Sequence, residues 1–116
     1  VLVSGLALAL GAGALLPGAL HAQVYHASEA ENEAWAKRLA EAQRELEAAR
    51  KRAEQAEAAY VKAVRDEYPT GDARVELREE AKQAKAELRQ AEARFPELLE
   101  EARRSGVLPE VLRPYR

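Results

Sequence analysis

Residues 35–102 decide the fold of this chain, and they read WAKRLAEAQRELEAARKRAEQAEAAYVKAVRDEYPTGDARVELREEAKQAKAELRQAEARFPELLEEA. Apolar and small residues recur through this stretch at alternating steps of four and three, which is the spacing of a narrow seam between two helices. The pattern predicts an all-α fold, an antiparallel two-helix coiled-coil hairpin. The seam positions are Trp35, Leu39, Ala42, Leu46, Ala49, Ala53, Ala56, Tyr60 and Ala63, followed by Leu77, Ala81, Ala84, Leu88, Ala91, Phe95, Leu98 and Ala102.

The first helix is expected at about residues 29–67 and the second at about 72–105. Ser28 followed by Glu31 has the spacing of a capping box, in which each residue's side chain binds the other's backbone N–H. Tyr68-Pro69-Thr70-Gly71 is a turn signal, because the residue before a proline is pushed out of the helical region. A connection this short makes the two helices antiparallel neighbours.

The second helix contains one proline and is followed by a short apolar segment. Pro96 is expected to kink the helix, because its ring removes one backbone hydrogen bond and crowds the preceding turn. Gly106 is a typical residue just past a helix C-terminus. Residues 109–113 begin with a proline and predict one short helical turn near the C-terminus.

The register of the hairpin can be tested from the sequence, because facing residues of an antiparallel pair have position numbers with a constant sum. A sum of about 137 places seam residues opposite one another and large residues mostly opposite small ones. On the flanks this register pairs Arg52 with Glu87 and Glu57 with Arg78, and it leaves one like-charge pair, Arg50 with Lys85. Exposed ion pairs are weak, so they select the register more than they stabilise it.

The first 20 residues contain no charged side chain, and the apolar run 6–16 has the length of a signal-peptide core. Pro17-Gly18 breaks the run, and Ala22 is a small residue before a cleavage site at Gln23. We therefore interpret residues 1–22 as a signal peptide and residues 23–116 as the helical hairpin. The alternative is an uncleaved N-terminal membrane anchor, for which this run has the minimum length.

The charge and cysteine content exclude several classes of site. The chain has 18 basic and 20 acidic residues, a net charge of -2, and the two signs are mixed along it. Because a nucleic-acid-binding protein is expected to present a basic face, we expect no nucleic-acid partner. The chain contains no cysteine, so disulfides, thiolate metal sites and thiol nucleophiles are absent.

The sequence predicts no enzymatic activity, no cofactor and no small-molecule substrate. Its acidic side chains are spread regularly along the helices, whereas paired catalytic carboxylates need a concave, water-poor pocket. His26 is interpreted as a surface histidine near a loose terminus, and no metal site is expected. A weaker alternative keeps a metal-binding role, in which processing before Val24 would let the terminal amine, two backbone nitrogens and His26 bind Cu(II) or Ni(II).

The middle of the seam is almost entirely alanine, and large apolar residues gather near the turn and near the other end of the hairpin. A two-helix unit with such a thin seam has little core, so association with another copy or with a protein partner is expected. The candidate partner surface lies near the turn, where apolar residues fall outside the seam. Its residues are Val61, Val64, Tyr68 and Val75.

The chain as a whole resembles small exported helical-hairpin proteins of the bacterial periplasm. We therefore expect a non-enzymatic structural or protein-interaction module that is periplasmic or secreted. If residues 1–20 are retained, the alternative is a coiled-coil protein tethered to the inner membrane.

Overall fold

A computed structural model describes residues 25–116, and the regular structure in this range is helical throughout. The helices are α3 (Glu29–Asp66), α4 (Gly71–Arg104), α5 (Pro109–Leu112) and the short 3-10 helix η1 (Arg113–Tyr115). These bounds lie within one or two residues of those that the sequence predicts. The predicted signal peptide or anchor, residues 1–22, lies outside the described residues.

The described chain divides into two compact units. The hairpin unit, Ala36–Glu100, contains most of α3 and α4. The terminal unit contains residues 25–35 together with Glu101–Arg116. Each unit has its own set of contacts, and each is described separately below.

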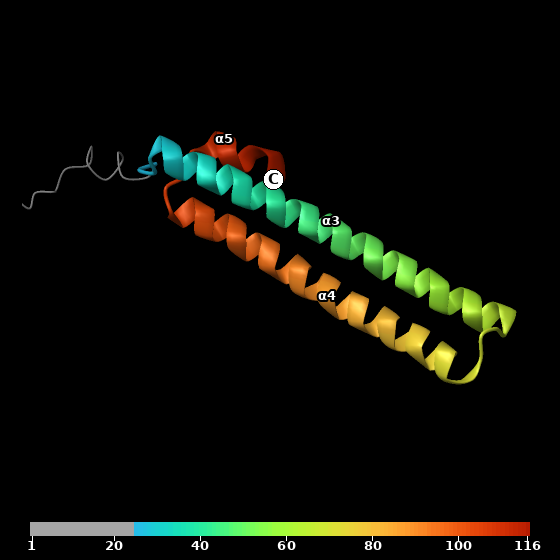
Figure 1. Cartoon of the computed structure of the whole chain (residues 1–116). Coiled ribbons are helices and arrows are strands. Elements are labelled where there is room, and N and C mark those ends of the chain that lie inside the picture. The colour runs from blue at the N-terminus through green and yellow to red at the C-terminus, as the bar shows by residue number, and fades with distance from the viewer. Residues whose placement is uncertain (1–24) are drawn as a thin grey trace, which may run out of the picture. The chain divides into compact units, whose positions relative to one another are not determined.

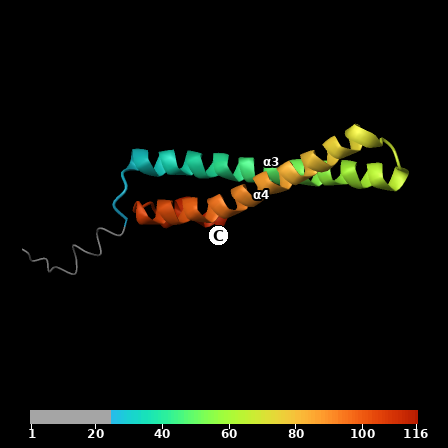
Figure 2. The same ribbon diagram turned by 90° about the horizontal axis from the view of Figure 1, so that it is seen from below.

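In the hairpin unit the two long helices pack against each other along antiparallel directions (Figure 1). Figure 2, the view turned by 90°, shows α4 crossing over α3 in projection part of the way along the hairpin. The buried side chains fall on predicted seam positions, so the expected helical hairpin is confirmed. They are Leu39, Leu46, Ala49, Ala53, Ala63, Ala81, Ala84 and Leu98.

The flank charges test the predicted register directly. Arg52 Nε lies 4.0 Å from Glu87 Oε1, as the register requires. The predicted partner of Glu57 was wrong, because Glu57 Oε1 lies 2.7 Å from Lys85 Nζ instead of pairing with Arg78. Arg78 Nε lies 3.7 Å from Glu79 on its own helix. Lys85, which the register placed opposite Arg50, therefore forms a cross-helix ion pair with Glu57 through its long side chain.

Helix α4 runs through Pro96 without a break in its assignment as a helix. The proline is exposed, so its missing N–H and its ring lie on the outer side of the hairpin, as its position beside the seam predicts. Within residues 25–116, none of the helices has both the length and the apolar character needed to cross a bilayer.

In the terminal unit, the predicted capping box at the start of α3 is confirmed. The Glu31 backbone N–H donates to Ser28 Oγ at 3.1 Å, and the Ser28 backbone N–H donates to Glu31 Oε1 at 2.7 Å. The two bonds satisfy backbone N–H groups at the helix start that would otherwise lack a partner. The Ser28 backbone bond, followed by the Ser28 hydroxyl bond, lowers the pKa of the Glu31 carboxyl below its ordinary value.

The end of α4 folds back in the same unit through a Schellman motif, a pair of backbone bonds that closes a helix C-terminus. The Gly106 N–H donates to the Arg103 carbonyl at 3.1 Å, and the Val107 N–H donates to the Ala102 carbonyl at 3.4 Å. Gly106 has a φ of +79°, in the region that side chains with a Cβ rarely adopt. The following segment then brings α5 beside the first turns of α3 (Figure 1).

Asn32 joins the segments of the terminal unit through its side-chain amide. Its Nδ2 donates to the Ala27 carbonyl at 3.3 Å and to the Ser28 carbonyl at 2.9 Å. Its Oδ1 accepts a bond from the Leu108 N–H at 2.9 Å. A backbone bond from the Ala27 N–H to the Gly106 carbonyl, 3.2 Å, adds a further link. The segment before α3 and the segment after α4 are therefore held together by specific polar contacts.

Candidate functional site

The hairpin tip, residues 60–77, is formed by the end of α3, the turn and the start of α4. Helix α3 ends in a Schellman motif of its own. The Glu67 N–H donates to the Val64 carbonyl at 3.3 Å, and the Tyr68 N–H donates to the Ala63 carbonyl at 3.1 Å. Glu67 occupies the left-handed position with a φ of +55°. Glycine is usual at this position, because a residue with a Cβ is strained there, but this chain has a glutamate.

Arg74 connects the start of α4 to the end of α3. Its Nε donates to the Pro69 carbonyl at 3.0 Å, and its Nη2 donates to the Ala63 carbonyl at 3.2 Å. The guanidinium therefore holds one carbonyl of the turn and one carbonyl at the C-terminus of α3. A positive charge at this end of a helix is favourable, because the exposed carbonyls carry partial negative charge. Arg74 fixes the shape of the tip from within.

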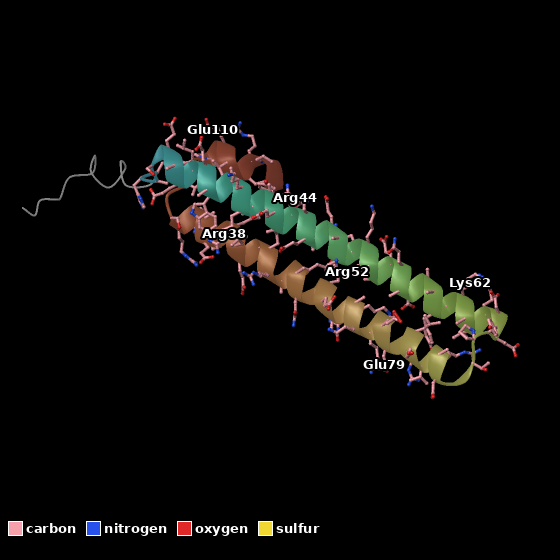
Figure 3. The ribbon with its side chains drawn as sticks, in the orientation of Figure 1. Arg38, Arg44, Arg52, Lys62, Glu79 and Glu110 are labelled. Atoms are coloured by element: carbon pink, nitrogen blue, oxygen red, sulfur yellow. The ribbon has the colours of Figure 1, made fainter. Side chains whose placement is uncertain are left out.

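Charged side chains surround the last turn of α3. Asp66 accepts a bond from Lys62 Nζ at 2.8 Å and another from Arg65 Nε at 3.2 Å. These two bonds, the Lys62 bond first, lower the pKa of the Asp66 carboxyl below its ordinary value. Figure 3 shows Lys62 on α3 and Glu79 on α4 among the charged side chains that surround the hairpin. The two cations offset the unfavourable position of a carboxylate at a helix C-terminus.

Apolar side chains remain exposed among these charges. Of the six large apolar residues exposed in the described chain, four lie between positions 61 and 75. These four are the residues that the sequence predicts as a partner surface. Their exposed fractions are Val61 48%, Val64 45%, Tyr68 78% and Val75 45%.

The three valines among these four residues lie on one side of the hairpin. Val61 and Val64 are three residues apart on α3, so they share a helix face, and Tyr68 follows in the turn after the helix ends at Asp66. Glu57 lies four residues before Val61 on the same face of α3, and its ion pair with Lys85 joins this face to α4. On α4, Arg78 and Val75 lie seven and ten residues before Lys85, so they share the face of Lys85. The three valines of the predicted partner surface therefore share one side of the hairpin.

An open groove lies on the opposite flank of the hairpin unit, where Arg52 meets Glu87. Its volume is about 450 Å³, and small or polar side chains line it. The groove contains carboxylates and an arginine in open contact with solvent, without the enclosed pocket that separates the pKa values of a catalytic acid and base. Its lining residues are Arg52, Gln55, Ala56, Ala59, Glu80, Gln83, Ala84 and Glu87.

His26, the residue of the weaker metal-binding hypothesis, lies in the terminal unit. A Cβ added at Gly106 would lie 2.8 Å from the His26 backbone nitrogen and 2.9 Å from Nε2. The histidine therefore packs against the Gly106 backbone, whereas the sequence suggested a loose terminus. Between residues 25 and 116, no three histidine, aspartate or glutamate side chains are grouped as metal ligands.

Sequence reasoning missed both polar residues that shape the two ends of the structure, Asn32 and Arg74. Asparagine in the first turn of a helix is a weak signal, since its usual role is to cap the helix locally. Arg74 falls on the seam spacing three positions before Leu77, so an arginine at an apolar position was the available signal. The comparisons give no further guide to function, because no protein-family model, no curated protein and no solved structure matches this chain.

Proposed function

We propose that this chain is an exported, non-enzymatic helical-hairpin protein that acts as a structural or protein-interaction module in the bacterial cell envelope. The observation that carries the proposal is the exposed apolar surface at the hairpin tip. Val61, Val64, Tyr68 and Val75 are all exposed around a turn whose backbone is held by Arg74. An exposed apolar cluster on a fixed backbone is typical of a protein-binding surface.

The charges around the tip support a protein partner. Aromatic residues contribute strongly to binding surfaces, and Tyr68 presents an aromatic ring beside aliphatic side chains. Lys62, Arg65 and Asp66 provide a polar rim at the edge of the apolar surface. This arrangement of an apolar centre and a charged rim matches the usual anatomy of a protein interface.

The coiled-coil character and the export of the chain belong to the same proposal. Alternating steps of four and three place the buried residues on a narrow seam, which favours the coiled-coil interpretation. The uncharged run at residues 1–20, followed by a small residue at position 22, supports export and cleavage before Gln23. The cell-envelope location rests on this run.

Site-specific photo-crosslinking in the native cell tests the interaction role. A photo-crosslinking amino acid replaces Tyr68, and a second chain carries the same group at Arg44, an exposed position on the outer side of α3 (Figure 3). We expect a defined protein adduct from position 68 and none from position 44. Equal crosslinking from both positions, or none from either, would contradict an interaction role for the tip.

The mature N-terminus tests the export proposal separately. Mass spectrometry of the chain purified from its own cell is expected to find Gln23 at the N-terminus. A chain that retains residues 1–22 and sediments with the membrane would instead support the tethered form.

A further inference from the structure

Two rows of side chains run along one side of the hairpin, one step outside the buried seam. We call this side the valine face. Each row advances by alternating steps of three and four residues, so its members share one side of their helix. The α3 row is Glu47, Arg50, Glu54, Glu57, Val61 and Val64, the α4 row is Val75, Arg78, Lys82, Lys85 and Arg89, and Tyr68 lies in the turn between the two helices.

The ion pair between Glu57 and Lys85 shows that the two rows lie next to each other, because it joins them at 2.7 Å. Arg52 and Glu87 lie one step outside the seam in the other direction, and their contact at 4.0 Å marks the opposite flank. The valine face therefore comprises the apolar residues of the tip and then two parallel rows of charge.

The two rows carry opposite charge. Between residues 47 and 57 the α3 row has three glutamates and one arginine, Arg50. Between residues 78 and 89 the α4 row has four basic residues and no acidic one. Glu79 lies 3.7 Å from Arg78 and 4.0 Å from Lys82, so it offsets part of the basic row near the tip. Lys85 and Arg89 continue the basic row beyond it.

The core beneath the valine face is thin. From residue 47 to residue 90, every buried side chain is an alanine: Ala49, Ala53, Ala63, Ala81 and Ala84. The valines in the same region stay nearly half exposed. Alanine side chains bury little apolar area, and a pair of helices that packs through them has little hydrophobic stabilisation of its own. A partner that covers the valine face would supply the missing apolar layer.

We propose that the partner of the valine face is a second copy of this chain, related by a two-fold axis that runs along the hairpin. This axis exchanges the two sides of the face, so α3 of one copy lies over α4 of the other. Each acidic row then meets a basic row, and the apolar tip of one copy meets the apolar tip of its partner. The result is a four-helix arrangement with both hairpins pointing the same way.

Charge selects this axis over the other two-fold arrangement of the same face. An axis across the hairpin would place α3 over α3 and α4 over α4. The glutamate rows would then face each other, as would the basic rows, and like charges in an interface are costly. That arrangement would also place the two apolar tips at opposite ends of the dimer, where they cannot meet. Only the axis along the hairpin matches both charge and apolar surface.

The inference rests on the proposed interaction role of the tip and specifies the partner. The two proposals can fail separately. Photo-crosslinking at position 68 that traps a different protein, with a monomeric purified chain, supports the interaction role and overturns self-association. A purified dimer that gives no crosslink to any other protein supports self-association as the whole of that role.

Sedimentation equilibrium of the purified full chain is the first test. We expect a mass that rises with protein concentration from that of one chain towards twice this value. Two charge-reversed variants change one row each: Glu54→Lys with Glu57→Lys, and Lys82→Glu with Lys85→Glu. Each variant alone places like charges across the interface, so we expect its dimer dissociation constant to rise by about 100-fold.

Mixing the two reversed variants provides the decisive comparison. At positions 54, 57, 82 and 85 one variant carries only basic residues and the other only acidic residues, so their equimolar mixture restores opposite charges at both contacts. We expect the mixture to regain a mass near twice that of one chain. The matched control, Arg44→Glu with Lys51→Glu, reverses two charges on the outer side of α3 and is expected to dimerise like the wild type. Recovery in the mixture also shows that both variants are folded.

A spin label at the tip determines the direction of the two hairpins. Because the chain has no cysteine, Thr70→Cys provides a single attachment site in the exposed turn. With both hairpins pointing the same way, the two labels are expected within about 25 Å of each other. In the opposite arrangement each label lies roughly 20 Å along the helix from the level of Lys85, so the labels are roughly 40 Å apart.

Three results would each overturn the inference. The first is a wild-type mass that stays at that of one chain up to millimolar concentration. The second is dimerisation that survives both charge reversals, which would place the contact on another surface. The third is a label separation near 40 Å in a wild-type-like dimer, which would reverse the direction of the hairpins.

Discussion

The two long helices end in the same backbone motif but in different surroundings. At the end of α4, Gly106 takes the left-handed position, and the next residue, Val107, is only 2% exposed. At the end of α3, Glu67 takes the same position, and the next residue, Tyr68, is 78% exposed. Both ends satisfy the helix carbonyls, so backbone hydrogen bonding does not distinguish them.

The difference lies in what covers each end. Gly106 lies so close to His26 that a side chain has no room, and Asn32 links the neighbouring segments. At the hairpin tip Arg74 binds the Ala63 carbonyl from within, and the apolar side chains Val64 and Tyr68 remain exposed to solvent. The comparison teaches that a helix C-terminus needs glycine for close approach more than for the motif itself. Where the end stays open, a strained residue such as Glu67 is tolerated.

Among the substitutions that test this comparison, the one at Gly106 is expected to change the free energy of unfolding most. Gly106→Ala adds a Cβ at a positive φ and places it 2.8 Å from the His26 backbone. We expect the free energy of unfolding to fall by about 2–3 kcal/mol, from left-handed strain and overpacking together. Urea denaturation at a fixed protein concentration measures it.

Gly71→Ala is the matched control for this substitution. Gly71 also has a positive φ, but a Cβ there meets nothing within 4 Å. We expect it to cost about 1 kcal/mol, the strain alone. Equal losses at the two glycines would show that His26 does not constrain the terminal unit.

Removal of the Arg74 side chain is expected to have the next largest effect on the free energy of unfolding, through the loss of contacts at the tip. Arg74→Ala removes the donors to the Pro69 and Ala63 carbonyls, so we expect a loss of about 1–2 kcal/mol in the free energy of unfolding. Arg74→Lys keeps the charge without the two-pronged geometry and should recover less than half of the loss. Arg94→Ala removes an exposed arginine on the same helix, outside the valine face, and serves as the control. If the control lowers the free energy of unfolding as much as Arg74→Ala does, the two hydrogen bonds of Arg74 do not stabilise the tip.

Replacement of Glu67 is expected to have a smaller effect of the opposite sign. Glu67→Gly relieves the left-handed strain at the open end of α3, at some entropic cost in the unfolded chain. We expect a gain of about 0.5–1 kcal/mol, measured by the shift of the urea midpoint with an unchanged slope. A loss of stability would mean that the glutamate side chain makes a compensating contact in solution.

The pH dependence of stability is the smallest expected effect. Glu31 in the terminal unit and Asp66 at the tip both have pKa values below their ordinary range in the folded chain. The unfolded chain therefore binds protons more readily, so stability is complete above the ordinary carboxyl pKa of about 4 and declines as pH falls through the lower folded values. Thermal melts of Glu31→Gln and Asp66→Asn between pH 2 and 6 measure separately how much each carboxyl contributes to the loss of stability in acid.

Each variant should show a shallower acid decline than the wild type. An unchanged decline in Glu31→Gln would mean that the capping box does not discriminate between the charged and neutral carboxyl. The same result in Asp66→Asn would assign the acid decline to groups outside the tip.

Local rules explain why much of the hairpin could be predicted from the sequence. The capping box of Ser28 and Glu31 needs only a fixed spacing, and its two bonds form as expected. The seam positions follow from helix periodicity, and the pairing of Arg52 with Glu87 follows from the register. The exposed residues at the tip were identified because they fall outside the seam.

Other features depend on distances between segments, which periodicity does not give. Glu57 pairs with Lys85 because the lysine side chain is long and can reach along the helix, so one-to-one pairing by heptad position was wrong there. Asn32 accepts a bond from Leu108, 76 positions away in sequence, through a fold-back that no local pattern specifies. The packing of His26 against Gly106 likewise requires both chain ends to be in place.

Hydrogen exchange at several protein concentrations tests most directly the contrast between a closed terminal unit and an open tip. We expect amides near Ala27, Gly106 and Val107 to be protected equally at all concentrations. Amides of residues 60–77 are expected to exchange faster in dilute protein and to gain protection as concentration rises and the valine face becomes covered. Protection at the tip that equals that of the terminal unit in dilute protein, with no dependence on concentration, would contradict this account.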